Sequence, residues 1–274
     1  MKSYVSAAAL LNSFELDCAA STVSAKSNVQ SAGKMLAAFP ALRSALLLGF
    51  WMLVSIGIGC APLQPRSEFV KLFPDDGVPQ GWVVTDWSDL RKAPPAGATW
   101  RVENGLLHGS TPRGTWLISE KEYGDFILEL EWKLGERGNS GVALRAPMFG
   151  DPAFDGMELQ MVDPRYFPPD EPPKPSELTG SLYRAAAPRV QVFKPTDWNK
   201  YEITCRGSHV KVVLNGMLIQ DVNLDEQTTR PHRHDGTEAS PLKDRPRRGH
   251  IGFQELSRGG GHVEVRNARI RVLD

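Results

Sequence analysis

Two neighbouring segments near the middle of the chain carry side chains suited to binding a polar ligand and to moving a proton. They read GNSGVALR (138–145) and GMELQMVD (156–163). Side chains alternate between the two faces of a strand, so Asn139 and Arg145 would share one face of the first segment, and Glu158 and Gln160 one face of the second. We expect all four side chains on the same concave face of the sheet. Amides and guanidinium groups form directional hydrogen bonds, and a carboxylate also accepts protons. The pattern therefore predicts a sheet with one face in a core and one face open to a ligand such as a sugar.

The same alternation has a plainer interpretation. Half-exposed antiparallel strands normally carry polar residues on their solvent side, and there Glu158 and Arg145 would simply form a cross-strand ion pair. Tyr183 has a similar alternative, as a core ring whose hydroxyl group reaches solvent. The choice of residues favours a ligand site, because Gly141 and Ala143 leave the polar face open beside Arg145.

The segments that must hold these residues also read as short strands. They cover residues 100–109, 126–134, 209–222, 250–256 and 262–274. In 126–134, Phe, Leu and Trp alternate with Glu and Lys, and Asn104-Gly105 and Asn215-Gly216 supply the positive φ angles of tight hairpin turns. No long segment has helical periodicity. Many short strands separated by turns predict an all-β fold, an antiparallel β-sandwich.

Two long polar segments, 164–178 and 225–248, interrupt the strands. Loops longer than about 12–15 residues in a compact domain are usually functional or disordered. The second segment contains His232 and His234, but two histidines without a pattern of partner carboxylates are more typical of a solvated loop than of a metal site. Cys205 stands on an apolar strand face and is expected in the core, so no disulfide framework or cysteine metal site follows.

The amino-terminal part reads as a leader. Residues 46–59 are apolar, follow Arg43 and end at Cys60. The run is too short for a membrane span of about 20 residues but suits a secretory signal. Its Gly59-Cys60 end is similar to a bacterial lipoprotein processing site, although Gly57 stands where Leu is usual. We therefore expect an exported protein, periplasmic or on the cell surface of a bacterium, held on the membrane by lipid on Cys60; cleavage to a free protein and an uncleaved anchor are the alternatives.

The expected organisation of the chain follows from this leader. It comprises an over-extended start or disordered segment (1–34), a signal peptide (35–60), a tether (61–68) and one domain (69–274). The formal net charge of +0 and the pI of about 7.0 give no electrostatic case for a nucleic-acid partner. Nothing in the sequence indicates the oligomeric state.

Several motifs occur in a fixed order along the expected domain. They are WRVENGLL (100–107), YGDFILELEWKL (123–134), GNSGVALR (138–145), GMELQMVD (156–163), TGSLYRAAAP (179–188), WNKYEI (198–203), LNG (214–216), GHIGFQ (249–254) and VRN (265–267). The series resembles the bacterial 3-keto-disaccharide hydrolase domain family from about residue 69 to the end. This resemblance implies a concanavalin-A-like jelly roll with the ligand on the concave sheet.

The chain departs from the family pattern in two places. PDDGVPQGW (74–82) replaces the usual Asn-Gly-Lys opening, and Glu255, Leu256 and Ser257 follow Gln254 where the family often has His-Gly. If that histidine takes part in the chemistry of the family, the second departure bears on activity. A non-catalytic carbohydrate-binding module with the same jelly roll is therefore the main alternative to an enzyme, and a surface scaffold protein is a further one.

The resemblance implies a substrate that is a glycoside already oxidised to a ketone at C3. The ketone acidifies the hydrogen on C2, a base removes it, the enolate expels the oxygen on C1, and water adds. Glu158 is the first candidate for the base and Asp163 the second, while Arg145, or a divalent cation held by Glu158, would stabilise the enolate. His250 is the candidate acid. The residues expected to bind sugar hydroxyls are Asn139, Gln160, Tyr183 and Gln254.

Overall fold

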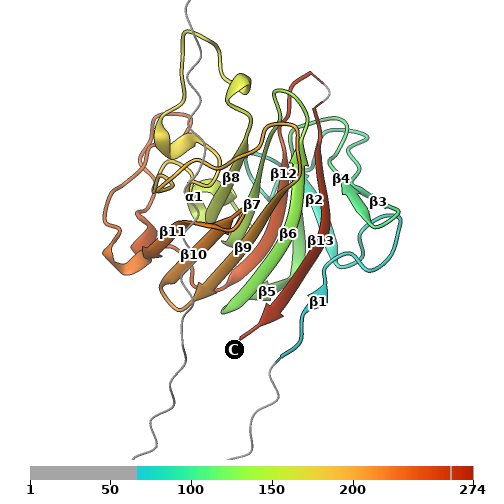
Figure 1. Cartoon of the computed structure of the whole chain (residues 1–274), viewed down its shortest axis with the longest axis horizontal. Coiled ribbons are helices and arrows are strands. Elements are labelled where there is room, and N and C mark those ends of the chain that lie inside the picture. Colours follow the sequence, from blue (N-terminus) through green and yellow to red (C-terminus); the bar gives the residue numbers. More distant parts are fainter. Residues whose placement is uncertain (1–66, 260, 274) are drawn as a thin grey trace, which may run out of the picture. The chain divides into compact units, whose positions relative to one another are not determined.

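The computed structural model describes residues 67–259 and 261–273, which form two antiparallel sheets packed face to face (Figure 1). Sheet A has the order β11-β10-β9-β6-β13-β4-β3, with β1 beside β13, and sheet B has the order β2-β5-β12-β7-β8. The strands of sheet A are β1 (Val70–Lys71), β3 (Arg101–Glu103), β4 (Leu106–His108), β6 (Phe126–Leu134), β9 (Asn199–Arg206), β10 (His209–Leu214), β11 (Met217–Asn223) and β13 (Val263–Val272). Those of sheet B are β2 (Trp82–Asp86), β5 (Thr115–Tyr123), β7 (Asn139–Ala146), β8 (Met157–Val162) and β12 (Gly249–Glu255). The predicted all-β antiparallel sandwich is confirmed.

Helical structure in the described residues is confined to single turns between strands. They are α1 (Pro152–Asp155) and 3-10 turns at Pro164–Tyr166, Pro175–Glu177, Leu224–Glu226 and Leu242–Asp244. The two hairpins expected from Asn-Gly are present, since Asn104 and Gly105 have φ of 52° and 74°, and Asn215 and Gly216 have 52° and 82°. Positive φ at both central residues gives the turn a twist that matches the flanking strands.

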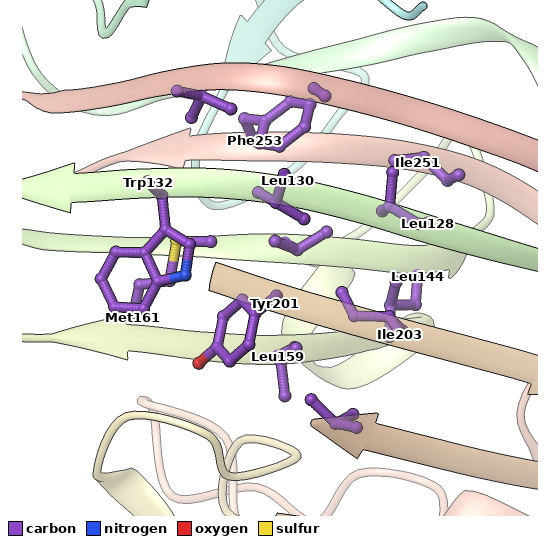
Figure 2. Close-up of a cluster of buried hydrophobic side chains, with 14 of the residues drawn as sticks. Leu128, Leu130, Trp132, Leu144, Leu159, Met161, Tyr201, Ile203, Ile251 and Phe253 are labelled. Carbon is purple, nitrogen blue, oxygen red and sulfur yellow. The ribbon is translucent and has the colours of Figure 1, made fainter. Parts of the chain in front are cut away.

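The core lies between the sheets, and the pattern of β8 decides which of its side chains enter it. Met157, Leu159 and Met161 point inward, where they join residues such as Tyr201 of β9, as Figure 2 shows for Leu159, Met161 and Tyr201. Cys205 is also fully buried in this core, as predicted. Because the odd-numbered residues of β8 fill the core, the even-numbered residues must face away from it. The outer face of sheet B therefore receives the polar side chains of β8.

The chain after β8 returns along its free edge and fixes the position of that strand. Gly180 N donates to the Gln160 carbonyl at 2.9 Å, Gln160 N donates to the Ser181 carbonyl at 3.0 Å, and Tyr183 N donates to the Glu158 carbonyl at 2.9 Å. From the core side, the Tyr201 hydroxyl also donates to the Gln160 carbonyl at 2.9 Å. The backbone of β8 is thus held from its edge and from the opposite sheet.

Arg145 is not on the outer face of sheet B, and the expectation that it shares a face with Glu158 is wrong. The register of β12 against β7 shifts between His250 and Gly252, and Arg145 has a φ of +54°. This irregularity breaks the two-residue alternation, since a bulge adds one residue to one strand of a pair. The side chain consequently enters the end of the sandwich, where it is fully buried.

The Arg145 guanidinium ties β7 to the β9–β10 turn of sheet A and to the β5–β6 turn, which joins the two sheets. Nε donates to the Gly124 carbonyl at 2.9 Å, Nη1 to the Gly207 carbonyl at 2.7 Å and Nη2 to Asp125 Oδ1 at 3.1 Å. Asp125 Oδ1 also accepts from Gly207 N at 2.8 Å. All three nitrogens of the side chain are engaged, so Arg145 stabilises the scaffold and is not placed to hold an enolate.

Within the described residues, no helix is long and apolar enough to cross a membrane. The leader and the candidate lipidation residue Cys60 lie outside the described residues.

We expect Arg145→Lys to lower the free energy of unfolding by about 2–4 kcal/mol, because a lysine cannot reach both carbonyls and the carboxylate. Urea unfolding of the purified protein measures the change. The control is Arg101→Lys, since the Arg101 side chain is 61% exposed on β3 and should cost less than about 0.5 kcal/mol. Wild-type stability in Arg145→Lys would contradict the scaffold role.

Candidate active site on the outer face of sheet B

Four polar residues predicted from the sequence do lie together on the outer face of sheet B. In the register of β7 with β8, Gly141 pairs with Gln160 and Ala143 pairs with Glu158. Asn139 lies two residues before Gly141 on the same face. Gln254 of β12 follows Phe253, which fills the core, so Gln254 also faces outward. Three adjacent strands thus present amides and one carboxylate on one surface.

The Glu158 carboxyl group lies over Gly141 and has almost no access to solvent. The residue is 3% exposed, and its Oε1 atom is buried with no hydrogen-bond partner. A Cβ atom on residue 141 would overlap Oε1 of Glu158. Glycine at position 141 therefore leaves room for the carboxyl group because it has no side chain.

Burial raises the pKa of Glu158 well above its usual value, and the negative charge of Asp151 raises it further. A buried carboxylate without a cation beside it loses its hydration without compensation. The proton affinity of Glu158 is thus much higher than that of an exposed glutamate. In its ionised form such a group takes a proton from carbon more readily than an ordinary carboxylate.

Asp151 supplies a second buried carboxyl group beside the first. It caps α1, with its Oδ1 accepting from Ala153 N at 3.0 Å, and it is 7% exposed. Burial raises the pKa of Asp151 to about 7, the charge of Asp155 adds to this, and the charges of Arg233 and Arg245 partly offset it. The two carboxyl groups repel each other when both are ionised, so near neutral pH the pair favours holding a proton.

Aromatic rings cluster around His234, and one of them, Tyr183, interacts electrostatically with both Glu158 and Asp151. The His234 ring lies 5.9 Å from Tyr183, 5.4 Å from Phe154 and 5.8 Å from Trp87, measured between ring centroids. Desolvation against these rings lowers the pKa of His234, and the charge of Arg184 adds to the effect. The imidazole is therefore largely neutral at pH 7.

An ion pair fixes the loop that carries His234. Arg233 donates to both carboxylate oxygens of Asp155, at 2.6 Å and 3.0 Å, which joins the 225–248 segment to α1. Arg245, from the same segment, is 4% exposed and donates to the carbonyls of Ala153 and Gly156 at 2.9 Å and 3.0 Å. These contacts fix α1, and with it Asp151, against the segment that carries His234.

The amide groups on the face leave hydrogen-bonding capacity unused. Gln160 Oε1 accepts from Met161 N at 2.8 Å, and no described residue accepts from its NH2 group. The Gln254 side chain makes no hydrogen bond to a described residue, and the buried Asn139 Oδ1 and Ser181 Oγ atoms are also unpartnered. Buried polar groups are nearly always paired in folded proteins. Unpaired groups gathered on one face are thus suited to the hydroxyl groups of a ligand.

An apolar cluster closes the neighbouring half of the outer face. Its buried members are Leu90, Trp116, Ile118, Ala143 and Ala146. The Trp116 indole donates to the Trp87 carbonyl at 3.0 Å, which ties this cluster to the loop that borders His234. The polar half of the face therefore has an apolar wall on one side.

Two further candidates from the sequence are engaged elsewhere. Asp163 caps the 3-10 turn that follows β8 and pairs with Arg165 at 2.5 Å. Burial acts to raise the pKa of Asp163, but the hydrogen bonds and the charge of Arg165 outweigh burial, so the pKa is lowered. His250 Nδ1 lies 2.7 Å from the Ser119 carbonyl oxygen, and Nε2 lies 3.6 Å from Glu122. Both side chains interact with their own surroundings rather than with Glu158.

The described residues contain no group of three or more His, Cys, Asp or Glu side chains arranged to hold a metal ion. Glu158 and Asp151 supply two carboxyl groups, which is fewer protein ligands than a dedicated cation site normally provides. The fit of this donor set to a resident divalent cation is therefore poor.

The sequence reasoning missed Asp151 and the rings of Trp87 and Phe154, and it assigned His234 to a solvated loop. The signal for Asp151 was available, because Asp-Pro at 151–152 is a typical start of a helical turn. The position of His234 depends on the Arg233–Asp155 ion pair, which joins residues far apart in the sequence. No local pattern could have shown it.

Comparisons with known proteins agree with the fold. The sequence model of the 3-keto-alpha-glucoside-1,2-lyase-like domain family matches residues 68–271. A candidate glycosyl hydrolase from Parabacteroides distasonis ATCC 8503 is 24% identical, with a TM-score of 0.59 over 75% of this chain and 100% of its own. A second one from the same organism is 23% identical, with a TM-score of 0.56 over 75% and 94%. Identity at this level establishes a shared fold, and no curated protein shows significant similarity.

The raised pKa values predict how stability depends on pH. The unfolded chain loses these protons near pH 4, whereas folded Asp151 keeps its proton to about pH 7 and Glu158 also titrates above its usual value. The folded state binds more protons in this interval, so stability falls as pH rises through it. We expect Glu158→Gln to be more stable than wild type at pH 8, on the order of 1–3 kcal/mol, with a smaller difference at pH 5.

Urea unfolding at both pH values measures this difference, and Glu120→Gln, a change at an exposed residue of β5, serves as the control. If Glu158→Gln is no more stable than the wild type at pH 8, burial of the ionised carboxyl group does not destabilise the folded protein.

Proposed function

The chain belongs to the 3-keto-alpha-glucoside-1,2-lyase-like domain family and is a carbohydrate-active protein, and from this premise we propose that it cleaves glycosides that carry a ketone at C3. The observation that carries the proposal is the buried, unpartnered carboxyl group of Glu158, with its raised pKa, on a face lined by unpaired amides. Deprotonation next to a ketone needs such a base. Ordinary glycoside hydrolysis by two carboxyl groups does not need a ketone.

In the proposed reaction Glu158 removes the proton from C2, and the electron pair forms an enolate with the C3 oxygen. The enolate then expels the glycosidic oxygen from C1, so the C1–O bond breaks, a C1–C2 double bond forms and the C3 ketone returns. Water adds its oxygen to C1, and C2 takes back a proton. The net result is hydrolysis, reached by elimination and hydration.

The other residues of the face have roles that follow from their chemistry. Asp151, with a pKa of about 7, holds a proton that can pass to the departing oxygen. Burial raises the pKa of Tyr183, so its hydroxyl stays protonated and can donate to the enolate oxygen, a role that the sequence had suggested for Arg145. Gln160, Gln254 and Asn139 would hydrogen-bond to sugar hydroxyls.

A non-catalytic sugar-binding module is less consistent with the surface. Such modules usually present a row of exposed aromatic rings to the sugar, whereas in residues 67–259 and 261–273 no tryptophan or tyrosine is exposed and Phe149 is the one exposed phenylalanine. Trp100, Trp116 and Trp132 are buried in the two sheets, and Trp82, Trp87 and Trp198 are partly buried. Turnover of a 3-keto-disaccharide, compared with the unoxidised disaccharide, separates an enzyme from a module.

We expect Glu158→Gln to lower kcat for a 3-keto-disaccharide by about 10²–10⁴-fold and to leave binding nearly unchanged, because glutamine keeps the shape but cannot accept the proton. Turnover is measured by release of the second sugar, and binding by calorimetry. The matched control is Glu120→Gln, an exposed glutamate of the same sheet, which should keep wild-type kinetics. Near-wild-type turnover in Glu158→Gln would place the base elsewhere. If the wild-type protein itself binds the 3-keto-disaccharide but does not turn it over, the sugar-binding module is favoured.

We also propose that the protein is exported and lipidated at Cys60, on the basis of the apolar run at 46–59, its Gly59-Cys60 end and the proline-containing tether. Mass spectrometry of the mature amino terminus from the native bacterium should find a lipid-modified Cys60. An intact terminus at Met1 or Met35 in a soluble cytoplasmic fraction would overturn the proposal.

A further inference from the structure

A hollow of about 750 Å³ lies beyond the end of β8 and is outside the chemistry described so far. Its lining consists of Arg137, Arg165, Arg258, Phe167 and the prolines Pro164, Pro168, Pro169, Pro172 and Pro173. In Figure 1 the loop that follows β8, in yellow, and the turn between β12 and β13, in red, lie at the same end of the sandwich. The hollow thus combines guanidinium groups with a wall of rigid rings.

Backbone hydrogen bonds place this hollow next to the candidate active site. Arg258 N donates to the Arg137 carbonyl at 3.2 Å, and Leu256 N donates to the Asn139 carbonyl at 2.9 Å. Asn139 is on the outer face of sheet B, and Ala143, the partner of Glu158, lies four residues further along β7. At about 3.3 Å per residue, Glu158 is about 13 Å from this end of the face. If the 3-keto sugar ring binds at Glu158, the group attached to its C1 can extend along this distance and reach the hollow.

The positive charges of the hollow are only partly compensated. Arg165 pairs with Asp163 at 2.5 Å and with Glu136 at 3.0 Å. Arg137 and Arg258 are exposed, and neither forms an ion pair with a carboxylate among the described residues. The other acids at the tip of this loop, Asp170 and Glu171, form no ion pair with them. Two guanidinium groups are therefore available to an anion.

The orientation of one of these groups is fixed by an aromatic ring. The Arg258 guanidinium lies 4.3 Å from the centroid of Tyr166, and the Tyr166 hydroxyl accepts from Arg113 at 3.2 Å. Arg113 also donates to the Leu256 carbonyl at 2.9 Å. Stacking on a ring holds a guanidinium plane while its N–H groups remain free to donate.

From these features we propose that the hollow binds the leaving group of the substrate and that this group is a ring bearing a carboxylate. Arg137 and Arg258 would bind the carboxylate, because planar guanidinium groups match its two oxygens. Phe167 and the prolines would pack against the ring. The proposal rests on the proposed function, since it assumes that a 3-keto sugar occupies the Glu158 end of the face.

The test compares two synthetic substrates, the 3-keto-glucosides of 4-hydroxybenzoate and of 4-hydroxybenzamide, which differ in the charge of the ring substituent. The wild-type protein should favour the benzoate by about tenfold in kcat/KM, through a lower KM. The double variant Arg137→Gln with Arg258→Gln should lose this preference and keep its kcat for the benzamide. Arg101→Gln, a change at an exposed arginine of β3, is the control and should keep the preference. Equal kcat/KM for the two substrates in the wild type overturns the proposal.

Calorimetry with free 4-hydroxybenzoate and 4-hydroxybenzamide separates this inference from the proposed function, because it needs no turnover. If neither glucoside is cleaved but the benzoate binds and the double variant loses this binding, the proposed function fails and the carboxylate site stands. If both glucosides are cleaved without preference, the function stands and the carboxylate site fails. A third outcome assigns the arginines to a membrane surface and overturns the proposal. In that case the wild type shows no preference for the benzoate but binds anionic lipid vesicles, and the double variant does not bind them.

Discussion

A carboxyl group buried without a cation beside it is the constraint on which the rest of the site depends. Glu158 is 3% exposed and its Oε1 atom has no partner, so its ionisation is opposed by lost hydration and by the charge of Asp151. The fold must supply enough stability elsewhere to keep the group in this position. The packing of two sheets and the Arg145 contacts between them provide that stability. The free-energy cost of burying the Glu158 carboxyl group is thus confined to the outer face of sheet B.

The position of the carboxyl group follows from a short series of structural causes. Apolar residues at odd positions of β8 turn Glu158 outward, and Gly141 on β7 leaves space above the sheet for its carboxyl group. The backbone of β8 is held at Gln160 by Tyr201 from the opposite sheet and by Gly180 from its own edge. Loops then add Asp151 and the rings around His234. Rigid strands thus place the base, and loops complete its surroundings.

Much of the fold was predictable because local rules and the tertiary structure agree. The alternation of 126–134 matches β6, and the Asn-Gly turns have the expected positive φ angles. The shared face of Asn139, Glu158 and Gln160 followed from the same alternation. Arg145 was placed wrongly because a bulge and a positive φ interrupt the alternation at that residue. Asp151 and His234 reach the site through loops held by long-range contacts, such as Arg233 with Asp155, which no sequence window contains.

Proton removal from C2 is the central claim, and isotope incorporation tests it most directly. The purified protein is incubated in heavy water with a 3-keto-disaccharide, and the released 3-keto sugar is analysed by mass spectrometry and NMR. The account predicts deuterium at C2, above the level in the same product incubated without protein, because the proton taken by Glu158 is replaced from solvent. Cleavage that leaves the original hydrogen on C2 would contradict elimination and would assign another mechanism to this face.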